Sequence, residues 1–464
     1  MNVSSQEIAD AVGAIRRTAV DGIVPAGYSI DSRTLRVGDC FIAIRGPNFD
    51  GHQFIPAALR QGADLVIAAA DTQFPVEPGW PVIFVDDTRV ALQQLAHHVR
   101  QKWGKTVIAV TGSSGKTTTK EILGALLQTR FQVCRSFGNL NNDYGLPLSI
   151  LRLGETHDLA ILEIGMSRAR EIQRLCGVAQ PNIGIVTNVR TVHLENFKSL
   201  QAIASAKREL IEALPPDGIA VLNNDDAQVR KFGRSFPGRV ITFGVEAPAT
   251  YRVSEIRFQG LDGNEFRLDY RSKGHLLKLP LIGEHNIYNC LPAIAVAHHL
   301  GVGFETIDQS LRQLKPVAGR GEVLHFKEGF SVLDDSYNSN PAALEAIIRF
   351  LKRVFGYRRK ILVAGEMLEL GASAEQFHRS CGRLAAAARI DWIVGVRGLG
   401  AALCQAAREA GHPSADTFFF ENSMEAGERL TQQVTGGDFI VVKGSRGVQT
   451  EKVIEVLKRD HAVR

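Results

Sequence analysis

The sequence predicts an α/β protein with three domains, and three observations support this prediction. The chain has 464 residues, which is more than a single hydrophobic core usually organises. Short apolar runs typical of buried strands alternate with stretches of helical periodicity. The pattern changes near residue 104 and again near residue 319. We therefore expect a small N-terminal α/β domain over residues 1–103, a central domain with a mainly parallel sheet over 104–318, and a C-terminal Rossmann-like domain over 319–464.

The first region combines short strand-like runs with polar loops. DCFIAI (39–44) and ADLVIAAA (63–70) are apolar enough to be buried strands, and the polar stretch RGPNFDGHQF (45–54) follows the first of them. A shorter run, YSI (28–30), precedes Ser32 and Arg33. Polar residues that follow strands directly are candidate ligand-binding positions.

The central region begins with an expected strand at 106–110. Three further apolar runs, at 158–165, 182–188 and 218–226, each end in polar residues, and helical stretches lie between them. This alternation indicates a largely parallel sheet. Ligands bind such sheets at the carboxyl ends of the strands, so the polar residues there are candidates for a site.

The third region contains five strand candidates and two clear helical patterns. The strand candidates are FSVLDD (330–335), KILVAG (360–365), DWIVGV (391–396), DTFFFEN (416–422) and DFIVVKG (438–444). AALEAIIRFLKR (342–353) and SMEAGERLTQQV (423–434) have helical periodicity. The alternation predicts a second doubly wound domain.

Composition argues against several classes of function. The formal charge of +5 is small for this length and predicts neither a nucleic-acid nor a membrane partner, although it is compatible with an anionic substrate. The start lacks a signal-peptide pattern, and no apolar run is long enough to cross a bilayer. Six scattered cysteines without a CxxC pair predict reduced thiols. We expect a cytoplasmic, monomeric protein.

The stretch VIAVTGSSGKTTTK (107–120) predicts a phosphate site. It places a glycine-rich turn between an apolar strand and a helix, where Gly112 and Gly115 let the backbone present its amides. Lys116 can reach the phosphates, and the hydroxyl of Thr117 can ligate Mg²⁺. The loop is a short form, because Val110 stands where the longer pattern has glycine. The alternative is a solvated loop with an incidental lysine.

Three other residues are candidates for the site only in combination with this loop. Glu163 ends an expected strand, where a carboxylate linked to the metal should lie. His193 follows the next strand, and Lys207 lies in an expected helix. Each has an ordinary alternative: a strand-end carboxylate facing water, a satisfied histidine, or a solvated lysine.

Several motifs together resemble the Mur ligases, the ATP-dependent amide-bond ligases of peptidoglycan precursor synthesis. The similarity extends over nearly the whole chain and is carried by GYSIDSRTLRVGDCFIAIRGPNFDGHQFI, TGSSGKTTTK, GNLNNDYGLPLSIL and GEHNIYNCLPAIAVA. DDSYNSNPAAL, GEMLELG and VVKGSRG resemble in particular the branch that adds D-alanyl-D-alanine. The resemblance implies that a UDP-linked tripeptide is activated by ATP as an acyl phosphate, which the amine of the dipeptide then attacks.

The resemblance also implies residue roles. Lys116, Glu163, His193 and Lys207 would be catalytic, with Thr117 and Glu163 holding one Mg²⁺, His193 a second, and Lys207 carbamylated by CO₂. The ATP-binding residues would be Gly112, Ser113, Ser114, Gly115, Lys116, Thr117, Thr118, Asn286, Asn289, Arg320, Asp335, Tyr337 and Asn338. The UDP end would be bound by Ser32, Arg33, Asn48, Asp50, Gly51 and His52.

The chain departs from the family pattern in two places. Residues 167–171 read SRARE where an Asn-His pair followed by Gly-Glu is expected, and residues 196–198 read NFK instead of Gly-Phe-Gly. We expect the first departure to change how peptide substrates are held: either Arg168 or Arg170 pairs with a substrate carboxylate, or both are solvated at a helix start.

Other functions remain open from the sequence. A sister Mur ligase or a folylpolyglutamate-type ligase would use another acceptor. A nucleotide switch or motor would hydrolyse nucleotide without ligation, although no NKxD motif is present. A pure binding module would leave a triphosphate site with several candidate metal ligands unused. The third residue of the tripeptide, lysine or diaminopimelate, has no signature in the sequence.

Overall fold

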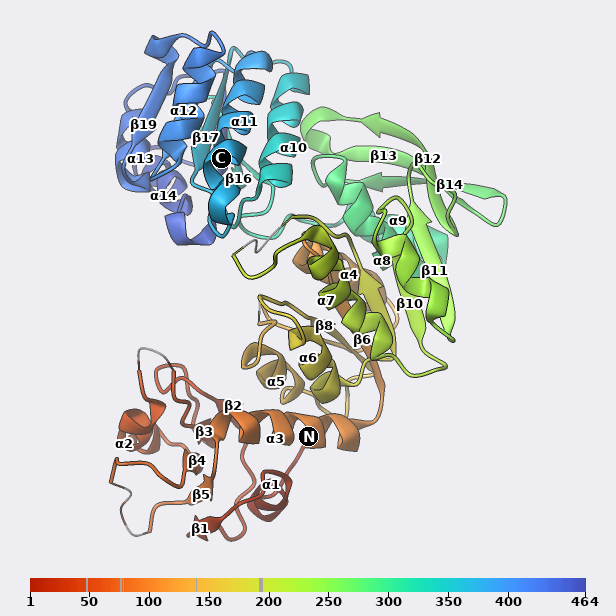
Figure 1. The fold of residues 1–464 in the computed structure, drawn as a ribbon, viewed down its shortest axis with the longest axis vertical. Helices are drawn as coiled ribbons and strands as arrows, with labels where there is room; N and C mark the ends of the chain where they lie inside the picture. Colours follow the sequence, from red (N-terminus) through yellow and green to blue (C-terminus); the bar gives the residue numbers. More distant parts are fainter. Residues whose placement is uncertain (47–48, 76, 78, 139, 192–194) are drawn as a thin grey trace. The chain divides into compact units, whose positions relative to one another are not determined.

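The computed structural model describes residues 1–46, 49–75, 77, 79–138, 140–191 and 195–464 (Figure 1). The chain forms two compact units. The first contains Met1–Val189, Ala204–Thr242 and Ala295–Ala297. The second contains Arg190–Ile203, Phe243–Ile294 and His298–Arg464.

The N-terminal part of the first unit is a five-stranded sheet in the order β1-β5-β4-β3-β2, parallel except for β1. Its elements are α1 (Ser5–Ala11), β1 (Arg16–Thr18), β2 (Gly27–Ser29), β3 (Asp39–Ile42), α2 (Ile55–Arg60), β4 (Leu65–Ala69), β5 (Val82–Val85) and α3 (Thr88–Trp103). β3, β4 and β5 are buried throughout, as their continuous apolar sequences predict.

Helix α3 connects this sheet to the next one within the first unit. Arg100 is buried, and its guanidinium donates to Ala179 O at 2.8 Å and to Gln180 O at 3.0 Å. The indole Nε1 of Trp103 donates to Gly154 O at 3.1 Å. The helix therefore belongs to the packing of both sheets.

The next five strands of this unit are parallel and belong to a nine-stranded sheet, in which their order is β10-β9-β6-β8-β7. Its elements are β6 (Thr106–Thr111), α4 (Lys116–Leu127), β7 (Val133–Arg135), α5 (Gly145–Ile150), β8 (Leu159–Glu163), α6 (Glu171–Ala179), β9 (Ile183–Val186), α7 (Leu200–Glu212) and β10 (Ile219–Asn223). The expected strands and the parallel arrangement are confirmed. The carboxyl ends of β6, β8 and β9 lie at the same edge of the sheet.

The other four strands of this sheet, for which we made no prediction, follow as one parallel pair and an antiparallel ribbon. The elements are β11 (Arg239–Gly244), β12 (Tyr251–Phe258), β13 (Asn264–Tyr270), β14 (Lys273–Leu279), α8 (His285–His299) and α9 (Phe304–Arg312). β12 and β13 pair antiparallel, as do β13 and β14. The hairpin between β13 and β14 turns through Arg271 (φ 46°) and Ser272 (φ 64°). Such turns favour Asn-Gly or Asp-Gly, so Arg-Ser gives no recognisable turn pattern.

The C-terminal sheet has the order β15-β16-β20-β17-β18-β19 and is parallel except for β15. Its elements are β15 (Glu322–His325), β16 (Ser331–Asp335), α10 (Pro341–Arg353), β17 (Arg359–Gly365), α11 (Ala374–Ala387), β18 (Trp392–Val396), α12 (Gly400–Glu409), β19 (Thr417–Phe420), α13 (Ser423–Thr431), β20 (Asp438–Lys443) and α14 (Glu451–Asp460). All five predicted strands are present, and β15 is an additional one.

Helices cover both faces of this sheet (Figure 1). α10, α11 and α12 contribute Leu344, Cys381 and Leu403 to the core on one face. α13 and α14 contribute Leu430 and Ile454 to the core on the other. The doubly wound arrangement predicted from the alternating pattern is therefore confirmed, and so is the α/β class of the chain.

All six cysteines are free and buried, as expected. Burial raises the pKa of every one of these thiols, that of Cys404 to about 11. Among the residues that the structure describes, no helix is long and apolar enough to cross a membrane.

Candidate nucleotide and substrate sites

The phosphate loop lies between the end of β6 and the start of α4. Gly112 has a φ of 153°, and a Cβ on it would lie 1.8 Å from Thr187 Oγ1, so only glycine fits there. The segment after β9 fixes the shape of the loop. Ser113 N donates to Asn188 O at 3.0 Å, and Ser114 N to Asn188 Oδ1 at 3.1 Å. Because α4 begins directly after the loop, its first amides and its positive end would face an anion bound there.

Lys116 is the first residue of α4, and its Nζ donates to Gly112 O at 3.0 Å. The side chain therefore folds back over the loop, where its charge can meet phosphate oxygens. This is the position that the sequence predicts for a phosphate-binding lysine.

Thr117 and Glu163 contact each other at the carboxyl edge of the sheet. Thr117 Oγ1 donates to Glu163 Oε2 at 2.8 Å, and Asn141 Nδ2 donates to Oε1 at 2.8 Å. Glu163 is buried at the end of β8, as predicted. A hydroxyl and a carboxylate are the oxygen ligands that Mg²⁺ takes when phosphates and waters complete its shell, so these residues fit that ion.

Within the described part of the chain, no three His, Cys, Asp or Glu side chains gather closely enough to hold a metal by themselves. The expected second ligand, His193, lies outside the described residues. Thr117 and Glu163 would therefore need further ligands, such as phosphate oxygens, to hold a metal ion.

Lys207 is buried in α7, so the alternative of a solvated lysine is wrong. Burial lowers the pKa of its amine well below the usual value, and the positive charge of Lys116 acts in the same direction. The interaction with Lys116 indicates that Lys207 belongs to the phosphate-loop side of the first unit. A neutral amine is also the form that reacts with CO₂.

Thr118 lies on α4 in the first unit, and the predicted ATP-binding residues beyond the phosphate loop and α4 lie in the second unit. Asn286 and Asn289 are buried near the start of α8, where Asn289 Nδ2 donates to Asn286 Oδ1 at 3.0 Å. The Arg320 guanidinium lies 3.9 Å from the centre of the Tyr337 ring. Asp335 ends β16, and its Oδ2 accepts from Lys443 Nζ at 2.6 Å.

Lys443 contacts predicted ATP-binding residues of the second unit, although we predicted no role for it from the sequence. It is buried at the end of β20 and also donates to Asn338 O at 3.0 Å. In this way Lys443 holds Asp335 and Asn338 together. The motif KGS offered no pattern from which this role could be inferred.

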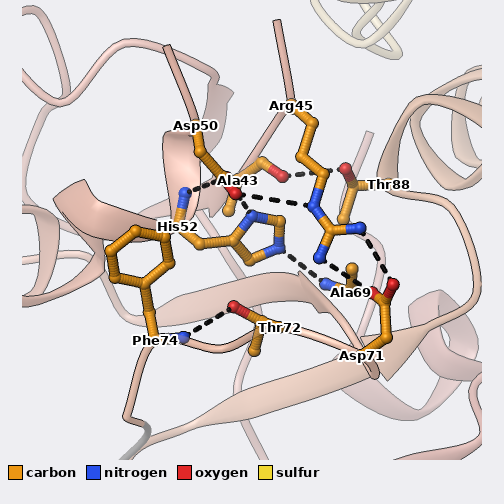
Figure 2. A network of polar contacts seen from close by, with 9 residues as sticks. All are labelled: Ala43, Arg45, Asp50, His52, Ala69, Asp71, Thr72, Phe74 and Thr88. Carbon is orange, nitrogen blue, oxygen red and sulfur yellow. Dashed lines mark hydrogen bonds and ion pairs between the residues drawn. The ribbon is translucent and has the colours of Figure 1, made fainter.

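The predicted UDP end lies at the carboxyl edge of the N-terminal sheet, and Figure 2 shows its polar network. His52 is fully buried, and its Nε2 accepts from Ala69 N at 2.8 Å. Its Nδ1 therefore carries the proton and donates to Asp50 Oδ1 at 2.5 Å. Burial alone would raise the pKa of Asp50, but the bonds from His52 and the charge of Arg45 outweigh it, so the pKa is lowered.

Arg45 and Asp71 complete this network. The Arg45 guanidinium meets both carboxylate oxygens of Asp71, at 2.8 and 3.0 Å, and lies 3.5 Å from Asp50. Gly51 is required for close approach, because a Cβ on it would lie 2.7 Å from Ile44 N. The Asp50 and His52 side chains are thus engaged in holding the loop that follows β3.

Two other residues of this end behave differently. Arg33 is exposed and forms a two-bond contact with Asp31, whereas Ser32 is only partly exposed. Both follow β2, as predicted. Asn48 lies outside the described residues.

The first departure from the expected sequence forms a loop before α6 whose backbone amides are hydrogen-bonded to two carboxylates. Glu171 Oε2 accepts from Ser167 N (2.6 Å) and Arg168 N (3.1 Å), and Glu209 Oε1 accepts from Arg170 N (2.8 Å). Arg168 and Arg170 are both exposed and precede the helix. In the second departure, Phe197 is buried between exposed neighbours.

Family models match three successive regions of the chain. Residues 26–100 match the model described as "Mur ligase family, catalytic domain", residues 110–297 match "Mur ligase middle domain", and residues 319–446 match "Mur ligase, glutamate ligase domain". The UDP-N-acetylmuramoyl-tripeptide–D-alanyl-D-alanine ligase of Bacillus subtilis is 33% identical over 97% of each chain. The ligase of the same name from Escherichia coli is 34% identical over 93% of each chain.

Solved structures agree with these relatives. MurF from Acinetobacter baumannii is similar with a TM-score of 0.87 and 29% identity, over 99% of each chain. MurF from Thermotoga maritima in complex with ADP has a TM-score of 0.81 and 30% identity, over 94% of this chain and 97% of the other. Together with the phosphate loop, Thr117 and Glu163, these similarities show that the chain belongs to the Mur ligase family.

Proposed function

We propose that this chain is an ATP-dependent, ADP-forming ligase that joins D-alanyl-D-alanine to UDP-N-acetylmuramoyl-tripeptide in peptidoglycan precursor synthesis. The observation that carries the proposal is the similarity, over 97% of the chain, to a relative named for this reaction. The complex of a similar MurF with ADP supports the use of ATP. We place the protein in the cytoplasm, as a monomer with domains at residues 1–103, 104–318 and 319–464.

The reaction must overcome the poor reactivity of a carboxylate. Phosphoryl transfer from ATP to the tripeptide carboxylate gives an acyl phosphate, the amine of the dipeptide attacks it, and phosphate leaves. The protein has to bring two anions together. Lys116 and the first amides of α4 supply fixed positive charge at the developing phosphoryl group. Mg²⁺, held by Thr117 and Glu163, would neutralise phosphate charge when bound.

Carbamylation of Lys207 is part of the proposal. Its burial and its lowered pKa favour the neutral amine, which adds CO₂ to form a carbamate. The resulting anion would hold metal beside His193 and would give the cationic Lys116 a partner of opposite charge.

The other assignments complete the proposed sites. Asn286 and Asn289 would meet the nucleotide base, and Arg320, Asp335, Tyr337 and Asn338 would close over ATP. Ser32, Arg33 and the 48–52 loop would bind the UDP end. In this loop, Asp50, Gly51 and His52 would act by holding the backbone.

The test is phosphate release by the full chain with ATP and UDP-tripeptide while the acceptor amine is varied. We expect phosphate release with D-alanyl-D-alanine and little phosphate release with L-alanyl-L-alanine or with single amino acids such as glutamate. Lys116→Ala should remain folded and lose on the order of 10²-fold or more in rate. Product mass should increase by the dipeptide less water.

The outcomes separate the alternatives. Release with a single amino acid would indicate a sister ligase, and release with folate substrates a folylpolyglutamate-type ligase. Steady ATP hydrolysis without any peptide would indicate a switch or motor. Near-normal ligation by Lys116→Ala would remove the phosphate-loop assignment.

A further inference from the structure

A lysine that the proposed chemistry does not use attaches the backbone at Ser136 and Gly138 to the phosphate-loop helix. Lys120 lies on α4, four residues beyond Lys116, and its side chain is fully buried. Its Nζ donates to Ser136 O at 2.7 Å and to Gly138 O at 2.9 Å, and lies 3.1 Å from Glu121 Oε1. The ammonium thus has two backbone acceptors and a carboxylate beside it as an ion-pair partner. Lys120 therefore acts on the protein and not on a phosphate.

The segment held by Lys120 carries Asn141, which reaches the candidate metal ligand. Asn141 Nδ2 donates to Glu163 Oε1 at 2.8 Å, and Asn141 O accepts from Gly165 N at 2.9 Å. A Cβ on residue 165 would lie 2.8 Å from Asn141 Cγ, so the amide packs directly against this glycine. Ser136 adds a second link, because its Oγ accepts from Glu163 N at 3.1 Å.

Glu163 thus has a donor for each carboxylate oxygen: Thr117 for Oε2 and Asn141 for Oε1. Two donors fix the plane of the carboxylate, which would otherwise rotate about its terminal bond. The Thr117 hydroxyl can keep donating to Glu163 while its oxygen lone pair faces a cation. Asn141 is therefore one of the two donors that orient Glu163, and it lies three residues after Gly138, whose carbonyl Lys120 holds.

We propose that Lys120 and Asn141 are positioning residues for the Mg²⁺ site. They orient the Glu163 carboxylate before the metal arrives, so they increase the affinity for Mg²⁺-nucleotide without touching metal or nucleotide. The inference rests on the proposed function, in which Thr117 and Glu163 hold Mg²⁺ with ATP. Burying a lysine charge is unfavourable, and here the ammonium fixes the segment through two bonds to its backbone carbonyls, at Ser136 and Gly138.

The test measures ADP binding to the full chain by titration calorimetry, with and without Mg²⁺. The variants are Lys120→Met, which keeps the approximate volume, Asn141→Leu, and the double variant. We expect each single variant to bind metal-free ADP as the parent does and to lose about 10–100-fold of the affinity gained from Mg²⁺, as for other supports of metal ligands. The double variant should lose no more Mg²⁺-dependent affinity than one single variant, because both changes interrupt the same series of contacts between Lys120 and Glu163.

Lys105 provides a matched control. It is exposed, and its Nζ donates to two backbone carbonyls, Glu155 O at 2.8 Å and His157 O at 2.7 Å, next to the amino end of β6. Lys105→Met removes the same kind of contact at the opposite edge of the sheet and should keep the full Mg²⁺ effect. If Lys120→Met does not fold, Asn141→Leu and Lys120→Arg still test the proposal, and Lys120→Arg should retain part of the Mg²⁺ effect.

Three results would overturn the inference: the variants keep the whole Mg²⁺ effect, they lose ADP affinity equally with and without Mg²⁺, or the two losses add in the double variant. The parent protein tests the proposed function separately. If Mg²⁺ gives the unmodified chain no gain in ADP affinity, the metal assignment of the proposed function is wrong and the inference fails with it.

Discussion

At the scale of single residues, Lys207 is a buried amine whose pKa is lowered by burial and by Lys116. The unfolded chain binds a proton at this amine up to about pH 10.4, whereas the folded chain releases it at lower pH. This difference favours unfolding. The penalty is fully present below the folded pKa and disappears as the pH rises towards the unfolded value.

We therefore predict that Lys207→Met raises the thermal midpoint in CO₂-free buffer although it abolishes ligation. The gain over the parent should shrink as the pH rises from about 7 to about 9.5, and each 1 kcal/mol corresponds to about 2–4 °C. Bicarbonate should stabilise the parent and leave the variant unchanged, as measured by scanning calorimetry.

Lys231→Met, at an exposed lysine, is the control and should show neither effect. An active parent protein whose thermal midpoint and activity do not change with bicarbonate would contradict carbamylation of Lys207. A parent-to-variant difference that grows with pH would contradict the predicted direction of the pH effect.

The two exposed arginines before α6 are the second residue-scale case. We predict that Arg168→Ala or Arg170→Gly raises KM for UDP-tripeptide or for the dipeptide about tenfold, equivalent to about 1.4 kcal/mol, while KM for ATP stays nearly fixed. A guanidinium pairing with a substrate carboxylate in two bonds gives this pattern. Glycine suits position 170 because its φ is 66°.

The control for these arginines is Arg208→Ala, which removes a surface ion pair with Glu212. Unchanged constants for every substrate in both variants would mean that Arg168 and Arg170 are simply solvated.

At the scale of secondary structure elements, the YNSNP motif places the start of α10. Asn340 is the N-cap and accepts from Ala343 N at 2.9 Å, and Pro341 occupies the first turn. Asn422 caps α13 in the same way, accepting from Glu425 N at 3.0 Å. Only the first cap lies next to Tyr337 and Asn338.

We predict that Asn340→Ala and Asn422→Ala each lower the free energy of unfolding by about 1 kcal/mol, which urea titration followed by circular dichroism would measure. Only Asn340→Ala should also raise KM for ATP, because its loop carries the proposed nucleotide contacts. Equal effects of the two variants on KM would remove the special role of this cap.

Most strands and the doubly wound third domain followed from the sequence because apolar runs of strand length are local patterns. β11 to β14 were missed, although EFRLDY (265–270) in β13 alternates polar and apolar residues and could have indicated a strand. The alternation of β12 is interrupted by a register shift between Val253 and Glu255, and the Arg271–Ser272 turn lacks the usual glycine. β15 was missed because it is short and half-buried.

The residues of the candidate site also divide into those that the sequence predicts and those that it does not. Lys116, Thr117 and Glu163 were predictable because the loop motif and the strand end fix their places. Lys120, Asn141 and Lys443 were not, because their roles depend on contacts with carbonyls and carboxylates distant in sequence, such as Lys443 with Asp335. The burial of Lys207 could likewise not be predicted from the sequence around it.

At the scale of the whole molecule, α3 makes the first sheet dependent on the second. We predict that the full chain binds UDP without ATP, with measurable heat in titration calorimetry. A fragment of residues 1–103 should bind UDP only at lower temperature, because Arg100 and Trp103 lose their partners at Ala179 and Gly154. Trp103→Phe, which removes one bond, should weaken stability without changing UDP affinity.

A well-folded full chain that gives no heat with UDP would contradict the assignment of the N-terminal sheet to the UDP end. A fragment as stable as the full chain would contradict the role of α3.

The six buried thiols have a practical consequence for labelling chemistry. Maleimides react with the thiolate, and burial keeps all six native cysteines protonated and inaccessible at neutral pH. The side chains of Val37 in the first unit and Phe355 in the second are 79% and 81% exposed. A chain carrying Val37→Cys and Phe355→Cys would therefore take a fluorophore at each of these positions while every native cysteine stays in place.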